Sequence, residues 1–72
     1  MFIKVTPFYE IDAEQIEALA REEEPQKDFP YVLKIITKGG RVYMAKYMFR
    51  AEREDEINRI LEKIKTAKEA TA

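Results

Sequence analysis

The sequence predicts one small α+β domain, in which a mostly antiparallel sheet centred on a hairpin at residues 31–50 is packed by a C-terminal helix at about 52–68. Three observations support this prediction. Two adjacent glycines separate two runs rich in β-branched and aromatic residues, and apolar residues recur at helical spacing near the C-terminus. A chain of 72 residues also leaves room for only one core.

The hairpin prediction depends on Gly39-Gly40, the only glycines in the chain. Glycine adopts the positive φ angles of tight turns without a Cβ clash, and the flanking residues suit a pleated, half-buried surface. We predict a two-residue turn, at Lys38-Gly39 or at Gly39-Gly40. A three-residue loop would shift the register by one residue and exchange the faces of one strand.

A two-residue turn sorts the hairpin side chains into two faces, because successive side chains alternate along a strand. The face that we predict to be the core is mostly aliphatic and comprises Leu33, Ile35, Thr37, Val42, Met44, Lys46 and Met48. The other face is aromatic and basic, and comprises Val32, Lys34, Ile36, Lys38, Arg41, Tyr43, Ala45, Tyr47 and Phe49.

Two further segments have clear periodicity. Residues Phe2 to Thr6 alternate between apolar and polar side chains, which predicts a strand added to the sheet. Pro7 cannot donate a backbone hydrogen bond, so the strand either ends there or runs along an edge of the sheet. The C-terminal segment has Ile57, Ile60, Leu61 and Ile64 at helical spacing, with acidic residues in its first turns and lysines in its last. An isolated helix of this length is marginal, so we expect its apolar stripe to pack on the aliphatic hairpin face.

Residues 12–24 support two interpretations. Asp12 as N-cap with Gln15 three residues later forms a capping box, which favours a helix that Pro25 would end. The run Glu22–Glu24 opposes this helix, because it would lie at the negative end of the helix dipole. The alternative is a short turn followed by a strand at 16–21. We prefer the helix and leave the strand open.

The composition excludes most kinds of active site. The chain has no histidine, cysteine or serine, which removes the usual nucleophiles, general bases and soft metal ligands. The glycine pair lacks the spacing of a phosphate-binding loop, and the acidic run lacks that of a calcium loop. We therefore expect no enzyme, no cofactor and no metal. Because no signal peptide or transmembrane run is present, we expect a cytoplasmic protein that does not bind membranes.

Charge is unevenly distributed, although the formal net charge is only −1. Residues 10–24 contain seven acidic residues and one basic residue, whereas residues 31–50 contain five basic residues and no acidic one. This asymmetry indicates either a basic surface for an anionic partner or two elements that attract each other within the fold.

Two functions remain as hypotheses. Small chains without disulfides often associate, so we expect a non-enzymatic interaction or regulatory protein that acts through a face of the hairpin and binds either another copy of itself, the partner that we favour, or a different protein. The side chains expected at this interface are Tyr43, Tyr47, Met48, Phe49 and Arg50. The alternative is a module that binds single-stranded nucleic acid, with Lys34, Lys38 and Arg41 contacting phosphates beside the tyrosine rings.

Two segments, IDAEQIEAL (Ile11–Leu19) and ITKGGRVYMAK (Ile36–Lys46), resemble the flagellar and swarming motility protein family of small bacterial and phage β-sheet proteins. Its members tend to show an Ile-Asn-Ala-like turn, a strand, a hairpin closed by Asn-Gly and a terminal acidic segment. The chain departs from this pattern at Asp12, at Lys38-Gly39 and in its longer C-terminal helix. The resemblance covers about half of the chain and implies a strand at 16–21 and a regulatory or binding role without catalysis. No catalytic residues carry over.

Overall fold

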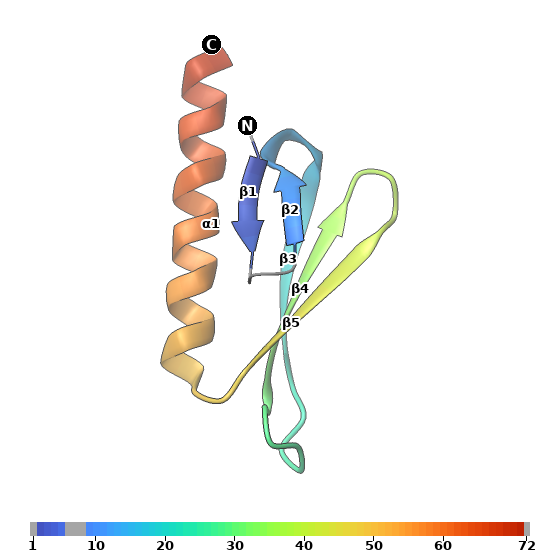
Figure 1. Ribbon diagram of the computed structural model, residues 1–72. Helices are drawn as coiled ribbons and strands as arrows, with labels where there is room; N and C mark the ends of the chain where they lie inside the picture. Colours follow the sequence, from blue (N-terminus) through green and yellow to red (C-terminus); the bar gives the residue numbers. More distant parts are fainter. Residues whose placement is uncertain (1, 6–8, 72) are drawn as a thin grey trace.

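The computed structural model describes residues 2–5 and 9–71, over which five strands and one long helix follow one another (Figure 1). The strands are β1 (Phe2–Val5), β2 (Tyr9–Asp12), β3 (Ile16–Glu23), β4 (Tyr31–Thr37) and β5 (Val42–Tyr47); a 3-10 turn, η1 (Ala13–Gln15), joins β2 to β3, and helix α1 covers Arg50–Thr71. All strand pairs are antiparallel, and they form a β1–β2 sheet and a separate sheet in the order β3–β4–β5. The α+β prediction is therefore confirmed.

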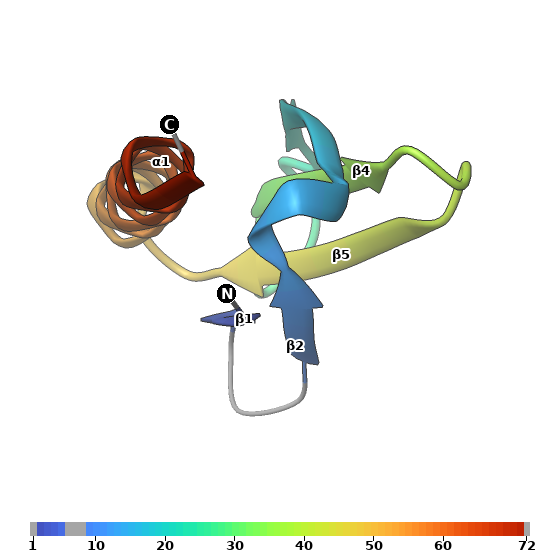
Figure 2. The same cartoon turned by 90° about the horizontal axis from the view of Figure 1, so that it is seen from above.

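The strands and the helix together form one elongated body of 43 × 24 × 19 Å. Helix α1 runs beside both sheets and contacts β1, β4, β5 and η1 (Figure 1). Viewed from above, the turn end of the β4–β5 hairpin projects away from α1 and from the β1–β2 sheet (Figure 2). The hairpin is thus held by the core at one end and extends into solvent at the other.

The core combines apolar side chains from both sheets and from the inner side of α1. Its buried members are Ile3, Val5, Ile11, Ala13, Leu33, Ile35, Ala45, Ile57, Ile60 and Ala67. Burial of an isoleucine or leucine side chain contributes about 1.5–3 kcal/mol, so these residues are the main source of stability. The predicted helical stripe is confirmed at Ile57, Ile60 and Ile64, but Leu61 is 50% exposed and does not belong to it.

The N-terminal strand was placed in the wrong sheet by the sequence. Residues Phe2 to Val5 do form a strand, but it pairs with β2, from Phe2↔Asp12 to Val5↔Tyr9, and not with the hairpin. The predicted end of this strand at Thr6 lies outside the described residues. Strand β2 itself was not predicted, because four residues give little periodicity.

The helix preferred for residues 12–24 is wrong, and the alternative strand is correct. Asp12 does act as a cap, since its Oδ1 accepts a hydrogen bond of 3.1 Å from the Glu14 backbone N–H, but it starts only the 3-10 turn η1. Strand β3 then pairs with β4 from Ile16↔Thr37 to Glu23↔Tyr31, with an irregularity after Ile16. Pairing with a distant strand overrode the local helical signals.

The hairpin turn has three residues, Lys38 to Gly40, so the two-residue turn is wrong. The Thr37 backbone N–H donates to the Arg41 carbonyl at 2.9 Å, and Gly40 N–H donates to the Thr37 carbonyl at 2.9 Å. Gly40 has a φ of 85°, which is the left-handed residue of a three-residue hairpin loop. The Thr37 side chain supports the same closure, because its Oγ1 lies 3.2 Å from both the carbonyl and the N–H of Arg41.

This loop shifts the pairing of β4 with β5 by one residue. Leu33 pairs with Ala45, and Lys34 pairs with Met44. The inner face therefore combines Leu33, Ile35 and Thr37 with Tyr43, Ala45 and Tyr47, whereas the outer face combines Val32, Lys34 and Ile36 with Val42, Met44 and Lys46. Both predicted faces were consequently half right: the β4 members of the predicted core are buried, and its β5 members point outward.

Candidate interaction surface

The outer face of the β3–β4–β5 sheet carries a group of small and apolar side chains that we call the outer patch. By register it contains Ala18, Ala20, Ile36, Val42 and Met44. Val42 and Met44 are 49% and 40% exposed, Ala18 is also exposed, and Ala20 and Ile36 are half-buried. The patch thus spans all three strands near the turn end of the hairpin.

The outer patch is exposed because no described helix or strand covers this part of the outer face, although Val32, on the same face but further from the turn, is fully buried. Helix α1 and the β1 residues that it contacts occupy the inner side, where Leu33, Ile35 and Ala45 are buried. Within the described residues, no further helix or strand is left for the other side. A three-stranded sheet with one covered face keeps apolar side chains in water unless another molecule covers them.

Two ion pairs border the outer patch at the end away from the turn. The Lys34 ammonium lies 2.9 Å from a Glu22 carboxylate oxygen, and the Lys46 ammonium lies 3.8 Å from Glu24. Exposed pairs of this kind contribute about 0–1 kcal/mol to stability. They show that the acidic segment 10–24 and the basic hairpin attract each other within the fold, which is the second of the two interpretations of the charge asymmetry.

Tyr43 and Tyr47, predicted at the interface, point to the inner face instead. The ring of Tyr43 meets that of Tyr9 edge to face, with centroids 5.1 Å apart, and its hydroxyl accepts a hydrogen bond of 3.2 Å from Arg41. Tyr47 packs against the core at the other end of β5. The predicted aromatic-basic face therefore does not exist as one surface.

The Tyr47 hydroxyl oxygen is buried and has no hydrogen-bond partner among the described residues. Burial raises the pKa of this phenol to about 12, because the charged form would be poorly solvated; the negative charge of Glu56 adds to this effect, and Arg59 partly opposes it. Tyr47 consequently stays neutral over the physiological pH range and behaves as a core residue.

The remaining predicted interface residues, Met48, Phe49 and Arg50, lie together at the junction of β5 with α1. Met48 and Phe49 are 48% and 61% exposed. The Phe49 backbone N–H donates to the Glu52 carboxylate at 3.3 Å, which caps the start of the helix. This junction lies at the opposite end of β5 from the turn that follows Thr37, so it is separate from the outer patch.

The three predicted phosphate-contacting cations are also divided between surfaces. Lys34 lies on the outer face and is paired with Glu22. Lys38 lies in the turn, where its backbone N–H donates to the Gln15 carbonyl at 2.8 Å. Arg41 follows the turn, and its guanidinium carbon lies 5.9 Å from the centre of the Tyr43 ring. These positions do not form one basic surface.

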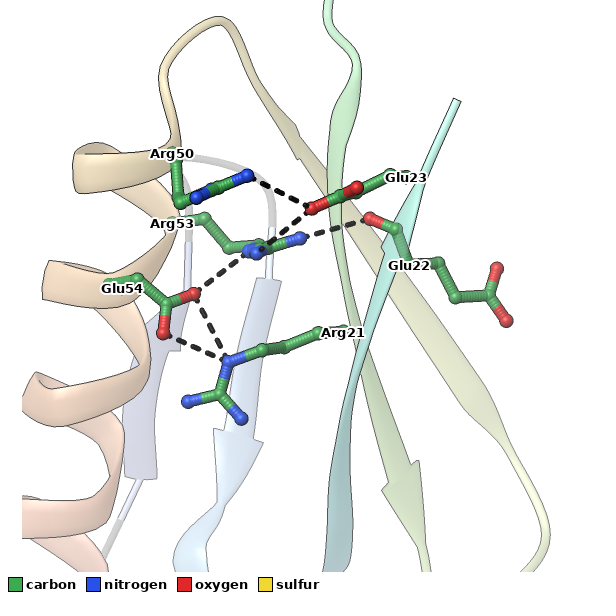
Figure 3. A network of polar contacts seen from close by, with 6 residues as sticks. All are labelled: Arg21, Glu22, Glu23, Arg50, Arg53 and Glu54. Carbon is green, nitrogen blue, oxygen red and sulfur yellow. Dashed lines mark hydrogen bonds and ion pairs between the residues drawn. The ribbon is translucent and has the colours of Figure 1, made fainter. Parts of the chain in front are cut away.

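A polar cluster fastens the start of α1 to the end of β3 (Figure 3). Its central residue is Arg53, which is only 4% exposed. Arg53 donates to the Glu22 carbonyl at 3.0 Å and to the Glu54 carboxylate at 2.9 Å, and its guanidinium carbon lies 5.4 Å from the centre of the Tyr31 ring. The cluster also contains Arg21, 2.9 Å from Glu54, and Arg50, 3.8 Å from Glu23.

Within this cluster, the Glu54 carboxylate receives two guanidinium groups. Desolvation alone would raise its pKa, but the hydrogen bonds from Arg53 and Arg21 outweigh it and lower the pKa below the ordinary value. Glu54 is therefore ionised at neutral pH and holds both arginines in place. The arrangement connects α1 to the sheet and has a structural role.

Sequence reasoning missed Arg53 and the outer patch. Position 53 stands four residues before Ile57, so it lies on the apolar stripe of the helix, and a charged residue on such a stripe is a signal of a buried ion pair. No comparable signal distinguishes Val42 and Met44 from core residues, because their exposure depends on the length of the turn.

Neither a protein-family model, nor a curated protein, nor a solved structure matches this chain. Among the described residues, no group of acidic side chains is arranged to hold a metal ion. No helix in the described part of the chain is long and apolar enough to span a membrane.

Proposed function

We propose that this chain is a non-catalytic interaction or regulatory protein that associates with a second copy of itself through the β4–β5 hairpin. The observation that carries the proposal is the outer patch, where Val42 and Met44 remain 49% and 40% exposed on a sheet whose other face is covered. Methionine is enriched in the cores of protein interfaces, where charged residues are depleted.

The size of the chain supports self-association. With 72 residues and no cysteine, it has no disulfide to add to a small core. Covering the outer patch with a second copy would remove apolar area from water at about 25 cal/mol per Å². The ion pairs of Lys34 and Lys46 would form part of the polar rim that surrounds such an interface.

The geometry favours a protein partner over single-stranded nucleic acid. Base stacking needs exposed rings beside free cations. Here Tyr43 and Tyr47 turn toward the core, and Lys34 is paired with Glu22. The outer patch is apolar and contains no ring on which a base could stack.

The resemblance to flagellar and swarming motility proteins is consistent with a regulatory role. That resemblance implied a strand at 16–21, and β3 (Ile16–Glu23) covers this segment. Our proposal therefore includes that this chain is related to that family and, like it, has a regulatory role without catalysis.

The test is the solution mass of the chain by light scattering over a wide concentration range. We expect a concentration-dependent dimer that Met44→Glu disrupts, with the dissociation constant rising at least about 30-fold, as is typical when a residue at the centre of an interface is lost. Met48→Glu is the matched control, because Met48 has a similar exposure of 48% but lies outside the patch. A monomer at every concentration, or equal weakening by both variants, would contradict the proposal.

A further inference from the structure

We propose that two copies join edge to edge through β5, antiparallel about a two-fold axis at Met44, to form a continuous six-stranded sheet. This inference deepens the proposed self-association and rests on it. It concerns the backbone of β5 in addition to the side chains of the outer patch.

Alternate residues of β5 direct their backbone hydrogen-bonding groups to the free edge of the sheet. Strand β5 is the last strand of its sheet and pairs only with β4 among the described strands. The Thr37–Arg41 pair is hydrogen-bonded, and hydrogen-bonded pairs alternate along an antiparallel ladder. Odd-numbered residues of β5 therefore bond to β4, whereas Val42, Met44 and Lys46 direct their N–H and C=O groups to the free edge.

The two edges of this sheet differ in how many charged side chains protect them. Free edges invite pairing with another strand, and proteins commonly protect them with charged side chains. Strand β3, the other edge, has four charged side chains, at Glu17, Arg21, Glu22 and Glu23, and its end is fastened to α1 by Arg53. Strand β5 has only Lys46, whose ammonium already lies 3.8 Å from Glu24. The β5 edge is thus the less protected one.

The β5 edge extends to the turn end of the hairpin. Both views show the turn end of the hairpin projecting away from α1 and from the β1–β2 sheet (Figures 1 and 2). The ring of Tyr43 meets that of Tyr9 of β2 on the inner face. Val42 and Met44, which are 49% and 40% exposed, lie toward the projecting end, where a strand could approach from the side.

The residues of β5 favour pairing with a second copy of the same strand in one register. An axis at Met44 pairs Val42 with Lys46 of the second copy, Met44 with Met44, and Lys46 with Val42. All three outward-facing residues then form hydrogen-bonded pairs, whereas axes one residue away leave only two such pairs within β5. No like charges oppose each other, in contrast to an axis at Lys46, which would place two lysines together. The strand is therefore complementary to itself. Pairing would place the two outer patches side by side on one face of the six-stranded sheet, forming a larger apolar surface that edge pairing itself does not cover.

Single cysteines test this geometry, because the natural chain has none. Opposite residues in a hydrogen-bonded pair have Cα atoms about 5.5 Å apart, within the range of a disulfide. We expect Met44→Cys to form a disulfide-linked dimer under mild oxidation. Val42→Cys and Lys46→Cys should each stay unlinked alone and crosslink when mixed. Met48→Cys is the control for random collision, because Met48 has a similar exposure, 48% against 40% for Met44, but lies outside β5.

The outcomes separate this inference from the proposed function. Crosslinking at Met44, and of the mixed pair, with little at Met48, would support edge pairing. A dimer by light scattering without these crosslinks would overturn edge pairing and leave self-association standing; face-to-face packing places sheets about 10 Å apart, too far for a disulfide between these Cα positions. A chain that is monomeric at every concentration would overturn both.

Discussion

Alanine substitutions at the two glycines should have opposite effects on stability, although the residues are adjacent. Gly40 has a φ of 85°, and a Cβ built at either glycine meets no atom within 4 Å. The difference between the two positions is therefore one of backbone conformation alone. A residue with a Cβ in the left-handed region costs about 1–2 kcal/mol, whereas alanine at a compatible site stabilises by about 0.4–1 kcal/mol by restricting the unfolded chain.

From these terms, Gly39→Ala should raise the free energy of unfolding by about 0.4–1 kcal/mol, and Gly40→Ala should lower it by about 0.5–1 kcal/mol. The restriction of the unfolded chain is the same in both variants, so the gap between them, about 1–2 kcal/mol, equals the cost of the left-handed conformation. For a domain of this size the gap corresponds to roughly 5–15 °C in Tm.

Urea unfolding followed by far-ultraviolet circular dichroism, at one fixed protein concentration, measures this gap. The concentration must be fixed because association would add to the apparent stability. A two-residue turn at either predicted position would require a positive φ at Gly39 as well. Gly39→Ala that destabilises as much as Gly40→Ala would therefore refute the three-residue loop and the register that follows from it.

Three further predictions concern the polar cluster and Tyr47. Arg53→Met should lower the free energy of unfolding by about 2 kcal/mol, since two charge-assisted hydrogen bonds are lost and relief of desolvation offsets part of the loss; Lys65→Met, on an exposed part of α1, should change it little. The pKa of Tyr47 is about 12 in the folded protein and about 10 in the unfolded chain. The contribution of the neutral Tyr47 side chain to the free energy of unfolding is therefore present below about pH 10 and is lost as the pH rises through about 12. Tyr47→Phe should remove that loss in urea titrations at alkaline pH, and equal losses in both proteins would contradict it. The pKa of Glu54 is lowered in the folded protein, so the contribution of its carboxylate to the free energy of unfolding is present above about pH 4.3 and is lost as the pH falls through the folded pKa. The natural protein should therefore be more stable than Glu54→Gln at neutral pH, by an amount that shrinks on acidification. A difference in stability that does not depend on pH would contradict this prediction.

The sequence predicted the elements whose signals are local. The glycine pair and the flanking β-branched residues determined the hairpin, and the spacing of Ile57, Ile60 and Ile64 determined the helix. In both cases the periodicity of the apolar residues and the residues at the turn or helix ends favour the same secondary structure, and the tertiary contacts stabilise that structure further.

Strand β3 shows where local signals fail. Asp12 and Gln15 match a helix-capping pattern, but the Asp12 side chain caps only the single 3-10 turn η1, where it accepts a hydrogen bond from the Glu14 backbone N–H. The strand that follows is stabilised by its ladder with β4 and by pairs such as Glu22 with Lys34. Those contacts join residues far apart in sequence, and no window of a single segment contains them.

The candidate surface depended on a finer detail, the length of one turn. A difference of one residue between Thr37 and Arg41 exchanges the faces of all β5 side chains. Met44 therefore moved from the predicted core to the outer patch, and Tyr47 from the predicted interface to the core. The site could not be derived before the register was known.

The register is therefore the measurement to make first, by nuclear Overhauser effects between Hα protons across β4 and β5. Non-hydrogen-bonded pairs bring Hα atoms close together. The three-residue loop predicts such a contact between Lys34 and Met44, which form a non-hydrogen-bonded pair. A contact between Ile35 and Met44, or between Lys34 and Tyr43, would indicate a two-residue turn; it would return Met44 to the inner face and contradict the outer patch and everything proposed from it.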